Sequence, residues 1–273
     1  MFPHTKLLGL SLYNWMYALG FAAMLGIHLC SRKKYGFGNV KTVLYTVMTF
    51  IYGVLGALLM GKIQTALVHY FDGPEGYGEG GVCIFGALLF LPVMMYLFSL
   101  VSKDSFRTLM DYTSGGIFAV LAAAKFGCVL AGCCYGVPSG WGVHNARVGA
   151  TLFPVQIFES ACTILVVALV LWLNFGPKEL KTGLVYPIGA IAYCVTRFFW
   201  EFFRHYDEDS ILKSLMFGLT FWQFFALLTI VLSIAWMIAI QKFEDRLPVL
   251  KSAQKGKKTR HLYKKGKTTS TKR

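Results

Sequence analysis

The sequence predicts an all-α integral membrane protein whose chain crosses the bilayer as seven helices. Of its 273 residues, 56% are hydrophobic and 16% are aromatic. The mean hydropathy is +0.55, which is outside the range of a water-soluble globular protein of this length. Stretches long enough to cross a hydrocarbon layer of about 30 Å recur along the chain. They fall at residues 9–29, 42–63, 83–101, 109–135, 155–173, 183–204 and 217–240.

The first of these stretches is expected to remain in the protein as a span. Its apolar run is longer than the core of a signal peptide, and no small-residue cleavage site follows it.

The distribution of lysine and arginine predicts the orientation of the spans. Basic residues gather in every second connection, at 30–41, 102–108 and 174–182, and in the tail after residue 240. The alternating connections, 64–82 and 205–216, are mainly acidic. Short positively charged loops stay on the cytoplasmic side of a membrane. We therefore expect the amino terminus outside and the carboxyl terminus in the cytoplasm.

The charge pattern divides the chain into a seven-helix membrane domain, 1–240, and a basic tail, 241–273. The tail has twelve basic against two acidic residues, so it carries +10 of the net charge of +14. Such a segment is expected to be disordered and to be drawn to anionic lipid of the inner leaflet. A nucleic-acid partner is not expected, because the sequence contains no recognised nucleic-acid-binding motif.

Three charges interrupt the sixth apolar stretch. Arg197, Glu201 and Arg204 are spaced by four and three residues, which places them on one face of a helix. Each charge near the centre of a bilayer costs at least ~2.5 kcal/mol on insertion scales. One explanation is that the planar guanidinium groups bind the phosphate of an anionic lipid. The other is an internally neutralised cluster, in which Glu201 pairs with either arginine and fixes two helices together.

A lysine interrupts the fourth apolar stretch. Lys125 lies among alanines and is followed by glycines at 127, 132 and 136. About ten apolar or small residues separate it from the next loop, so a cavity-facing lysine is favoured over one that reaches the interface. The glycines permit another backbone or a ligand to come close. The glycine-rich segments 64–82 and 136–154 predict irregular backbone that lines a cavity in the outward half.

Seven cysteines are scattered along the chain, mostly within spans, and they do not form an extracellular disulfide framework. Cys128, Cys133 and Cys134 raise the question of a metal site. We expect no metal, because neighbouring Cys133 and Cys134 cannot easily chelate one ion. No Cys-x-x-Cys pair or nearby histidine pair completes a tetrahedral set. These thiols are expected to be inert packing or, less favoured, to form a covalent intermediate. No cofactor is expected.

Several segments between about residue 10 and residue 240 carry a resemblance. They are YNWMYALGF at 13–21, Asp111, KFGCVLAGCCYGVP at 125–138, FPVQIFE at 153–159, RFFWEFFR at 197–204 and LTFWQ at 219–223. In this order they resemble the prolipoprotein diacylglyceryl transferase family, bacterial membrane enzymes that lipidate the cysteine of lipoprotein precursors. The sequence departs from the family pattern at Lys125 (arginine in the family), Cys128 (asparagine), Glu79 (histidine) and Phe153 (histidine).

The resemblance implies a reaction and a set of catalytic residues. A thiolate attacks the glyceryl carbon of phosphatidylglycerol, and glycerol phosphate leaves. Arg197 is expected to grip the phosphate, with Lys125 as a second cation and Arg204 nearer the entrance. With the family's histidines absent, Glu79 is one candidate base, provided that burial raises its pKa. The alternatives are that nearby cations lower the pKa of the substrate thiol, or that Glu79 is a solvated loop carboxylate.

The same resemblance implies the remaining site residues and partners. The expected substrate-binding residues are Tyr13, Cys128, Gly136, Gln156, Glu159, Glu201 and Arg204. Tyr13 is equally consistent with interfacial anchoring, and Gln156 and Glu159 with helix capping. The expected partners are phosphatidylglycerol and the signal peptide of a lipoprotein precursor, at the bacterial cytoplasmic membrane. Two alternatives remain: a divergent homologue with another donor or acceptor, and a non-catalytic lipid-binding or transport protein.

Overall fold

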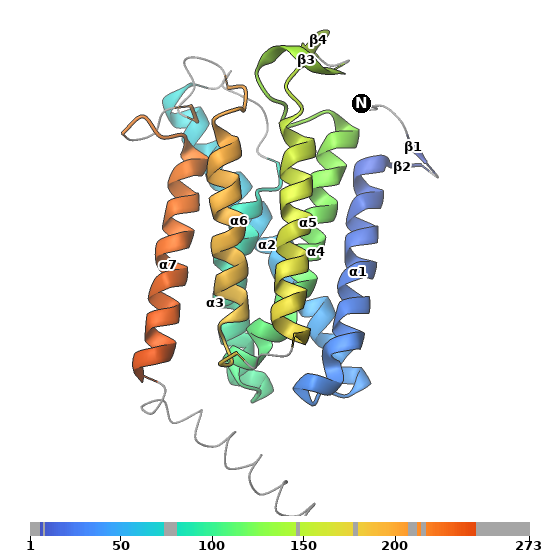
Figure 1. Ribbon diagram of the computed structural model, residues 1–273, viewed down its shortest axis with the longest axis vertical. Helices are drawn as coiled ribbons and strands as arrows, with labels where there is room; N and C mark the ends of the chain where they lie inside the picture. Colours follow the sequence, from blue (N-terminus) through green and yellow to red (C-terminus); the bar gives the residue numbers. More distant parts are fainter. Residues whose placement is uncertain are drawn as a thin grey trace, which may run out of the picture.

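The computed structural model describes residues 6–7, 9–73, 81–145, 148–176, 180–206, 212–213 and 217–243. In this part of the chain, seven helices lie side by side in one bundle (Figure 1). They are α1 (Leu12–Tyr35), α2 (Asn39–Phe71), α3 (Ile84–Ser102), α4 (Phe106–Ala131), α5 (Val155–Phe175), α6 (Val185–Glu201) and α7 (Phe221–Phe243). Two antiparallel hairpins pair β1 (Lys6–Leu7) with β2 (Leu10–Ser11) and β3 (Pro138–Asn145) with β4 (Ala150–Leu152).

Five of the helices in the described residues are long and apolar enough to cross a membrane: α2, α3, α4, α5 and α7. The chain is therefore a multi-pass membrane protein with an all-helical core. Helix α6 is only 17 residues long and ends at Glu201, so Arg197 and Glu201 lie on it. The prediction that Arg204 shares their helical face was wrong, because the chain leaves the helix in a turn at 202–203 before Arg204. Helix α2 continues to Phe71, eight residues beyond the end of the predicted span 42–63. Residues 74–80 of the glycine-rich segment 64–82 lie outside the described residues.

Helix α4 is the centre of the bundle. Of its most apolar window, 67% is buried inside the protein, against 28–39% for the other four candidate spans. Helices α1 and α5 both pack on it. Gly116 permits the close contact with α1, because a Cβ there would lie 2.5 Å from Nε2 of His28 and 2.5 Å from Cγ of Met24. Small residues at such crossings let helices approach closely where no hydrophobic effect drives them together.

Asp111 of α4 fixes the start of α6. Its side chain is buried and accepts hydrogen bonds from the backbone N–H groups of Gly183 (2.6 Å) and Val185 (3.0 Å). A carboxylate at this place satisfies N–H groups that a helix leaves unpaired and complements the helix dipole. Asp111 thus positions the helix on which Arg197 and Glu201 lie.

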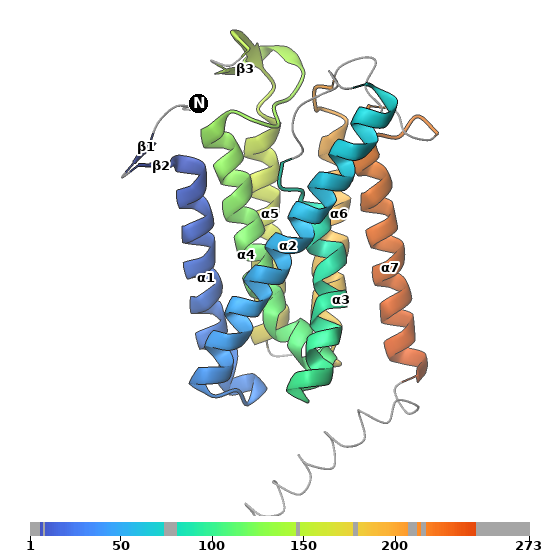
Figure 2. The same ribbon diagram turned by 180° about the vertical axis from the view of Figure 1, so that it is seen from behind.

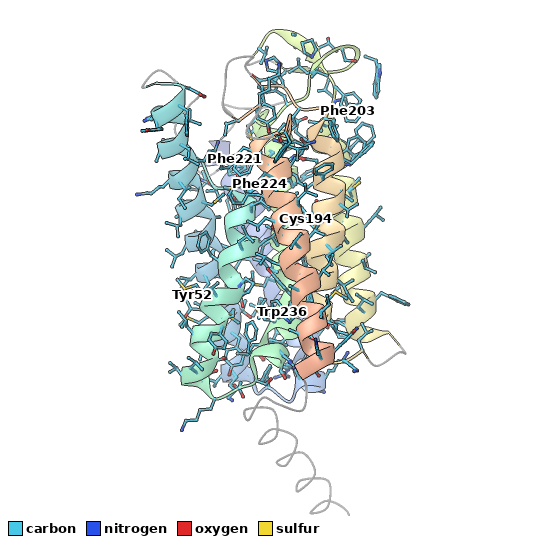
Figure 3. The ribbon with its side chains drawn as sticks, turned by 90° about the vertical axis from the view of Figure 1, so that its left-hand side faces the viewer. Tyr52, Cys194, Phe203, Phe221, Phe224 and Trp236 are labelled. Atoms are coloured by element: carbon cyan, nitrogen blue, oxygen red, sulfur yellow. The ribbon has the colours of Figure 1, made fainter. Side chains whose placement is uncertain are left out.

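Aromatic side chains anchor both ends of α7 (Figure 3). Phe221, at its start, is 1% exposed. Towards the other end, Trp236 stacks on Phe106 of α4, with ring centroids 5.1 Å apart. Offset aromatic stacking of this kind adds to the burial of apolar surface.

The connection from α4 to α5 forms the hairpin of β3 and β4, which rises beyond the end of the bundle (Figure 1). Its register shifts between Pro138 and Val143. Gly142 lies there with φ +147°, and a Cβ on it would overlap the carbonyl oxygen of Leu152. The glycine-rich segment 136–154 is therefore an irregular hairpin held against the bundle.

Helices α2 and α3 cross through two facing glycines, and α2 runs obliquely past its neighbours in the view from behind (Figure 2). A Cβ at Gly86 would overlap the carbonyl oxygen of Gly56. We expect Gly86→Ala to lower the free energy of unfolding by about 1–3 kcal/mol, because overpacking forces the two backbones apart. Unfolding of the purified protein in detergent measures this change.

Gly26→Ala is the matched control, because Gly26 is exposed on α1 and a Cβ there meets nothing within 4 Å. Equal stability of the two variants would contradict the importance of the α2–α3 crossing.

Candidate active site

A cavity of about 420 Å³ opens at the end of the bundle that carries the β3–β4 hairpin. Residues of α1, α2, α3, α4, α6 and α7 line it, together with the segments before α3 and after α4 and α6. Five of the residues predicted for the site are in its wall: Tyr13, Lys125, Cys128, Arg197 and Arg204. Residues as far apart in the sequence as Tyr13 and Trp222 thus line one concave site, which is the usual form of a small-molecule site.

Glu159 of α5 is the centre of an ion-pair cluster beside this cavity. One carboxylate oxygen, Oε2, lies 2.9 Å from Nζ of Lys125 and 2.6 Å from Nη2 of Arg204. The other, Oε1, lies 2.6 Å from Nη1 of Arg197. All four side chains are at most 8% exposed. The ion pairing expected of an internally neutralised cluster is present, with Glu159 as an additional partner. The cations also line a cavity, so the alternative prediction, that they bind a lipid phosphate, stays a prediction.

Glu201 is the second carboxylate of the cluster. It pairs with Arg197, and its Oε2 lies 3.6 Å from Nε of Arg204. Thr220 donates a hydrogen bond to its Oε1 (3.1 Å), and the hydroxyl of Tyr206 donates another. Burial and the Glu201 carboxylate raise the pKa of Tyr206, so its hydroxyl stays protonated and remains a donor.

The charge of the cluster is not fully balanced by its own members. Three cations face two carboxylates, which leaves one positive charge. Arg197, Arg204 and Lys125 all reach the cavity wall, whereas Glu159 and Glu201 are not among the residues that line it. Positive groups that are buried and held in fixed positions attract an anionic group more strongly than they would in bulk water.

Tyr13 and Tyr17 form the α1 side of the cavity. Their hydroxyls are 3.0 Å apart, and their rings meet edge to face at 5.1 Å. Gly127 of α4 makes room for them, since a Cβ there would lie 2.9 Å from Cδ2 of Tyr13. At Gly127 the close neighbour is thus a side chain, whereas the sequence predicted the approach of another backbone or a ligand.

Gln156 and Gly136 were also predicted to bind substrate, but they do not line the cavity. Gln156 is fully buried and donates a hydrogen bond to the carbonyl oxygen of Cys133 (3.0 Å). A Cβ at Gly136 would lie 2.5 Å from the carbonyl oxygen of Phe153 and 2.8 Å from that of Phe203. Both residues hold the segment after α4 in place and are not among those that line the cavity. Glu79 lies outside the described residues.

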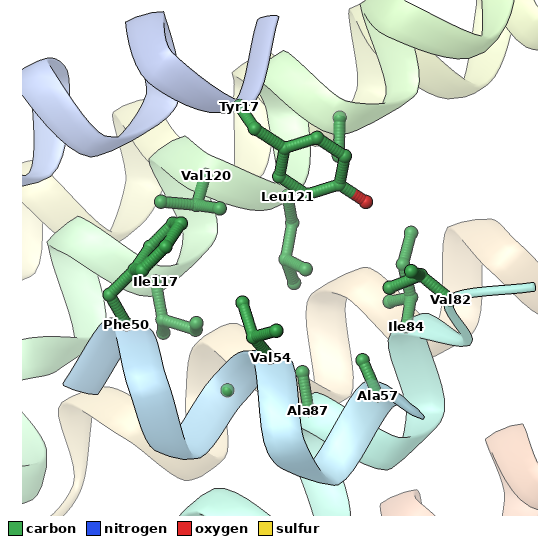
Figure 4. A pocket seen from close by; sticks show the side chains of 12 residues that line it. Tyr17, Phe50, Val54, Ala57, Val82, Ile84, Ala87, Ile117, Val120 and Leu121 are labelled. Atoms are coloured by element: carbon green, nitrogen blue, oxygen red, sulfur yellow. The ribbon is translucent and has the colours of Figure 1, made fainter. Parts of the chain in front are cut away.

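An apolar groove adjoins the cavity (Figure 4). It is lined by side chains of α1, α2, α3 and α4, which point towards a common space. Tyr17, Val82, Ile84 and Ala124 belong to both hollows. The accessible space in the groove is about 30 Å³, and its wall is almost entirely apolar. A polar, cationic hollow thus continues into an oily one, which matches the two ends of an amphiphile.

Sequence reasoning missed the part played by the residues after α6. His205 and Tyr206 line the cavity directly after Arg204, and the ring of His205 stacks on that of Tyr135, with centroids 5.8 Å apart. The backbone holds this segment too, because the N–H of His205 donates to the carbonyl oxygen of Tyr135 (3.3 Å). A polar pair immediately after a charged motif was the available signal.

The structure corrects one expectation about the cysteines. The sulfur atoms of Cys128, Cys133 and Cys134 lie within 4.8 Å of one another. The adjacency of Cys133 and Cys134 does not keep their thiols apart, because α4 ends at Gly132 (φ +69°) and Cys134 also has a left-handed conformation (φ +58°). The chain therefore turns back towards Cys128.

The fold and the site define a multi-pass helical membrane protein in which buried cations line a cavity beside an apolar groove. A sequence model of the prolipoprotein diacylglyceryl transferase family matches residues 3–239. The chain belongs to this family, whose members are enzymes, and it is a diacylglyceryl transferase of the lipoprotein biosynthesis type.

Individual relatives agree with this assignment. The chain is 28% identical over 252 residues to phosphatidylglycerol–prolipoprotein diacylglyceryl transferase of Clostridium tetani, covering 88% of this chain and 98% of the relative. It is 28% identical over 219 residues to the second such enzyme of Clostridium perfringens, covering 76% and 84%. It is 27% identical over 228 residues to the enzyme of Bordetella bronchiseptica, covering 79% and 85%.

We expect Glu159→Gln to lower the free energy of unfolding by about 3–5 kcal/mol, because it leaves buried cations without their shared partner. Chemical or thermal unfolding in detergent measures the loss. Lys41→Gln is the control: it removes a pair with Asp104 in which the lysine is 50% exposed, and such a pair contributes less than about 1 kcal/mol. A loss for Glu159→Gln no larger than that for Lys41→Gln would contradict the central role of Glu159.

Proposed function

We propose that the protein transfers the diacylglyceryl group of phosphatidylglycerol to the cysteine thiol of an exported lipoprotein precursor, releasing glycerol phosphate. The observation that carries this proposal is the excess positive charge at the wall of a cavity that continues into an apolar groove. Relatives of about the same length bear the name of this reaction.

The barrier of such a reaction lies in the negative charge that develops on the departing phosphate. Arg197 binds the phosphate, Lys125 is the second cation, and Arg204 lies towards the entrance. Glu159 and Glu201 hold the three cations in fixed directions, so little reorganisation is needed when charge develops. The negative charge of the phosphate balances the one positive charge that the two carboxylates leave over.

The apolar groove past Tyr17 and Ala124 offers about 30 Å³ of accessible space, enough for the first methylene groups of the lipid's acyl chains. Tyr13 and Tyr17 offer hydroxyls to the phosphate or glycerol oxygens. Binding both ends of the donor holds the glyceryl carbon at a defined place, which converts an encounter of two molecules into an oriented reaction.

The membrane arrangement follows from the same sequence features. The proposal is seven spans, α1 and α6 included, with the amino terminus outside and the basic tail on anionic inner-leaflet lipid of the bacterial cytoplasmic membrane. The cavity then opens towards the outer face, where exported precursors emerge. Supporting this, the basic connections 30–41 and 102–108 both lie at the bundle end away from the β3–β4 hairpin (Figure 1).

A second candidate function is lipid binding without transfer. The sequence departures at Glu79 and Phe153 favour it, because two histidines of the family pattern are missing while the cavity is kept. The two functions differ in one product, the thioether-linked diacylglycerol.

We expect Arg197→Ala to reduce formation of that thioether by about 10²- to 10³-fold, as removal of one preorganised charge-stabilising group does elsewhere. Purified protein, phosphatidylglycerol vesicles and a lipobox peptide, followed by mass spectrometry of the peptide, measure the rate. Arg197→Lys should fall between the two, since it keeps the charge and loses the planar fork.

Lys62→Ala is the matched control, because Lys62 is an exposed cation on α2 that does not line the cavity. Full activity in Arg197→Ala would remove the assignment of this residue. Retained phosphatidylglycerol binding without any thioether from the wild-type protein would favour the second candidate.

The orientation is tested by fusing a reporter after Arg273. A green fluorescent protein there should fluoresce, and alkaline phosphatase there should be inactive, because each folds to its active form on one side of the membrane only. The reverse pair of results would contradict a cytoplasmic carboxyl terminus.

A further inference from the structure

Three thiols converge in the wall of the cavity, next to the cations. The sulfur atoms of Cys128, Cys133 and Cys134 are within 4.8 Å of one another, and all three residues line the cavity. None of the three is in a disulfide. The reaction proposed above uses none of them as protein nucleophiles, so their convergence needs a separate explanation.

The turn that brings the thiols together is held by buried polar side chains. Nδ2 of Asn145, from β3, donates to the carbonyl oxygen of Gly132 (3.1 Å), and Nε2 of Gln156, from α5, donates to that of Cys133 (3.0 Å). Both side chains belong to residues with no exposed surface. Cys134 adopts the left-handed backbone conformation, with φ +58°. This conformation is unfavourable for any residue other than glycine, and it persists only where the surrounding structure imposes it.

We infer that the three cysteines bind one zinc ion as thiolates and leave its fourth position open to the cavity. Zinc–sulfur bonds are about 2.3 Å long, so thiolates around one tetrahedral ion lie about 3.8 Å apart. The observed arrangement reaches this spacing when each sulfur moves by less than about 1 Å, which side-chain rotation allows. Three protein ligands with one open position are typical of catalytic rather than structural zinc.

The charges of the surroundings favour such a site. Lys125, Arg197 and Arg204 all line the same cavity as the cysteines. Nearby cations stabilise thiolates, the form in which cysteine binds zinc, more strongly in a medium of low dielectric constant than in water. Soft thiolate ligands also select zinc over magnesium or calcium.

The open position fits the acceptor of the reaction, and this step rests on the proposed function. The cysteine thiol of the precursor binds the zinc ion and gives its proton to water in the cavity, because a coordinating thiol is deprotonated. Its sulfur then forms a bond to the glyceryl carbon while the bond from that carbon to the phosphate oxygen breaks. Glycerol phosphate leaves with the electron pair, and the neutral thioether, a weaker ligand, leaves the zinc ion.

Such a site would promote deprotonation of the substrate thiol in a sequence that lacks the two histidines of the family pattern. Glu79 and Phe153 stand at those positions, and phenylalanine cannot accept a proton. The zinc ion makes a thiolate available near neutral pH without a general base.

The first arm of the test measures metal in the protein without reference to activity. Purified reduced protein should contain about one zinc ion per chain. Replacement by cobalt(II) should give a thiolate-to-cobalt charge-transfer band in the near ultraviolet. Both signals should be lost in Cys133→Ser with Cys134→Ser and retained in Cys30→Ser, since Cys30 is an exposed cysteine of α1.

The second arm tests the open position. A lipobox peptide added to the cobalt protein should raise the band by about one third, because three thiolate ligands become four. The same peptide with serine in place of its cysteine should leave the band unchanged.

Several results would overturn the inference. One is wild-type protein with all seven thiols free that binds neither zinc nor cobalt, even after metal titration. A disulfide between any two of the three cysteines would also overturn it. So would a loss of metal in Cys30→Ser as large as in the double variant, or a cobalt band that stays unchanged when the lipobox peptide is added. Thioether formation by metal-free wild-type protein would also overturn it while leaving the proposed function intact. Stoichiometric zinc without thioether formation by any variant would instead contradict the proposed function.

Discussion

The site depends on one buried carboxylate. Glu159 contacts cations from three places in the sequence: Lys125 of α4, Arg197 of α6, and Arg204 just after α6. Removing a charge from water costs several kcal/mol, and only close pairing with good geometry offsets that cost. Because the three cations share Glu159, α4, α5 and the end of α6 must stay in register at this level. The same contacts aim the cations at the cavity, so the packing of the helices and the electrostatics of the site cannot be separated.

The surrounding fold serves to keep this cluster in place. Asp111 caps the start of α6 from the buried face of α4, and Gly116 and Gly86 let helices come close enough for a rigid bundle. At the other end, Asn145 and Gln156 fix the turn after α4. The polar residues inside the bundle thus pair mainly with backbone groups or with opposite charges, as the absence of water in a bilayer requires.

The cationic cavity and the apolar groove meet at α4. Lys125 and Ala124 are neighbours in α4, yet Lys125 joins the cations and Ala124 lines the oily groove. Neighbouring residues of α4 therefore face the cationic cavity and the apolar groove. In the function proposed above, this boundary separates the phosphate of the donor lipid from its hydrocarbon chains.

The sequence by itself determined the helical membrane class, because long apolar stretches have few other stable solutions in a bilayer. It also singled out Arg197, Glu201, Arg204 and Lys125, since charges in apolar runs stand out locally. Only the tertiary structure decided that Glu159 joins three of these charges, that Gln156 supports a turn, and that three cysteines meet. Those facts depend on contacts between residues far apart in the chain and on left-handed turns at Gly132 and Cys134, which residue spacing does not encode.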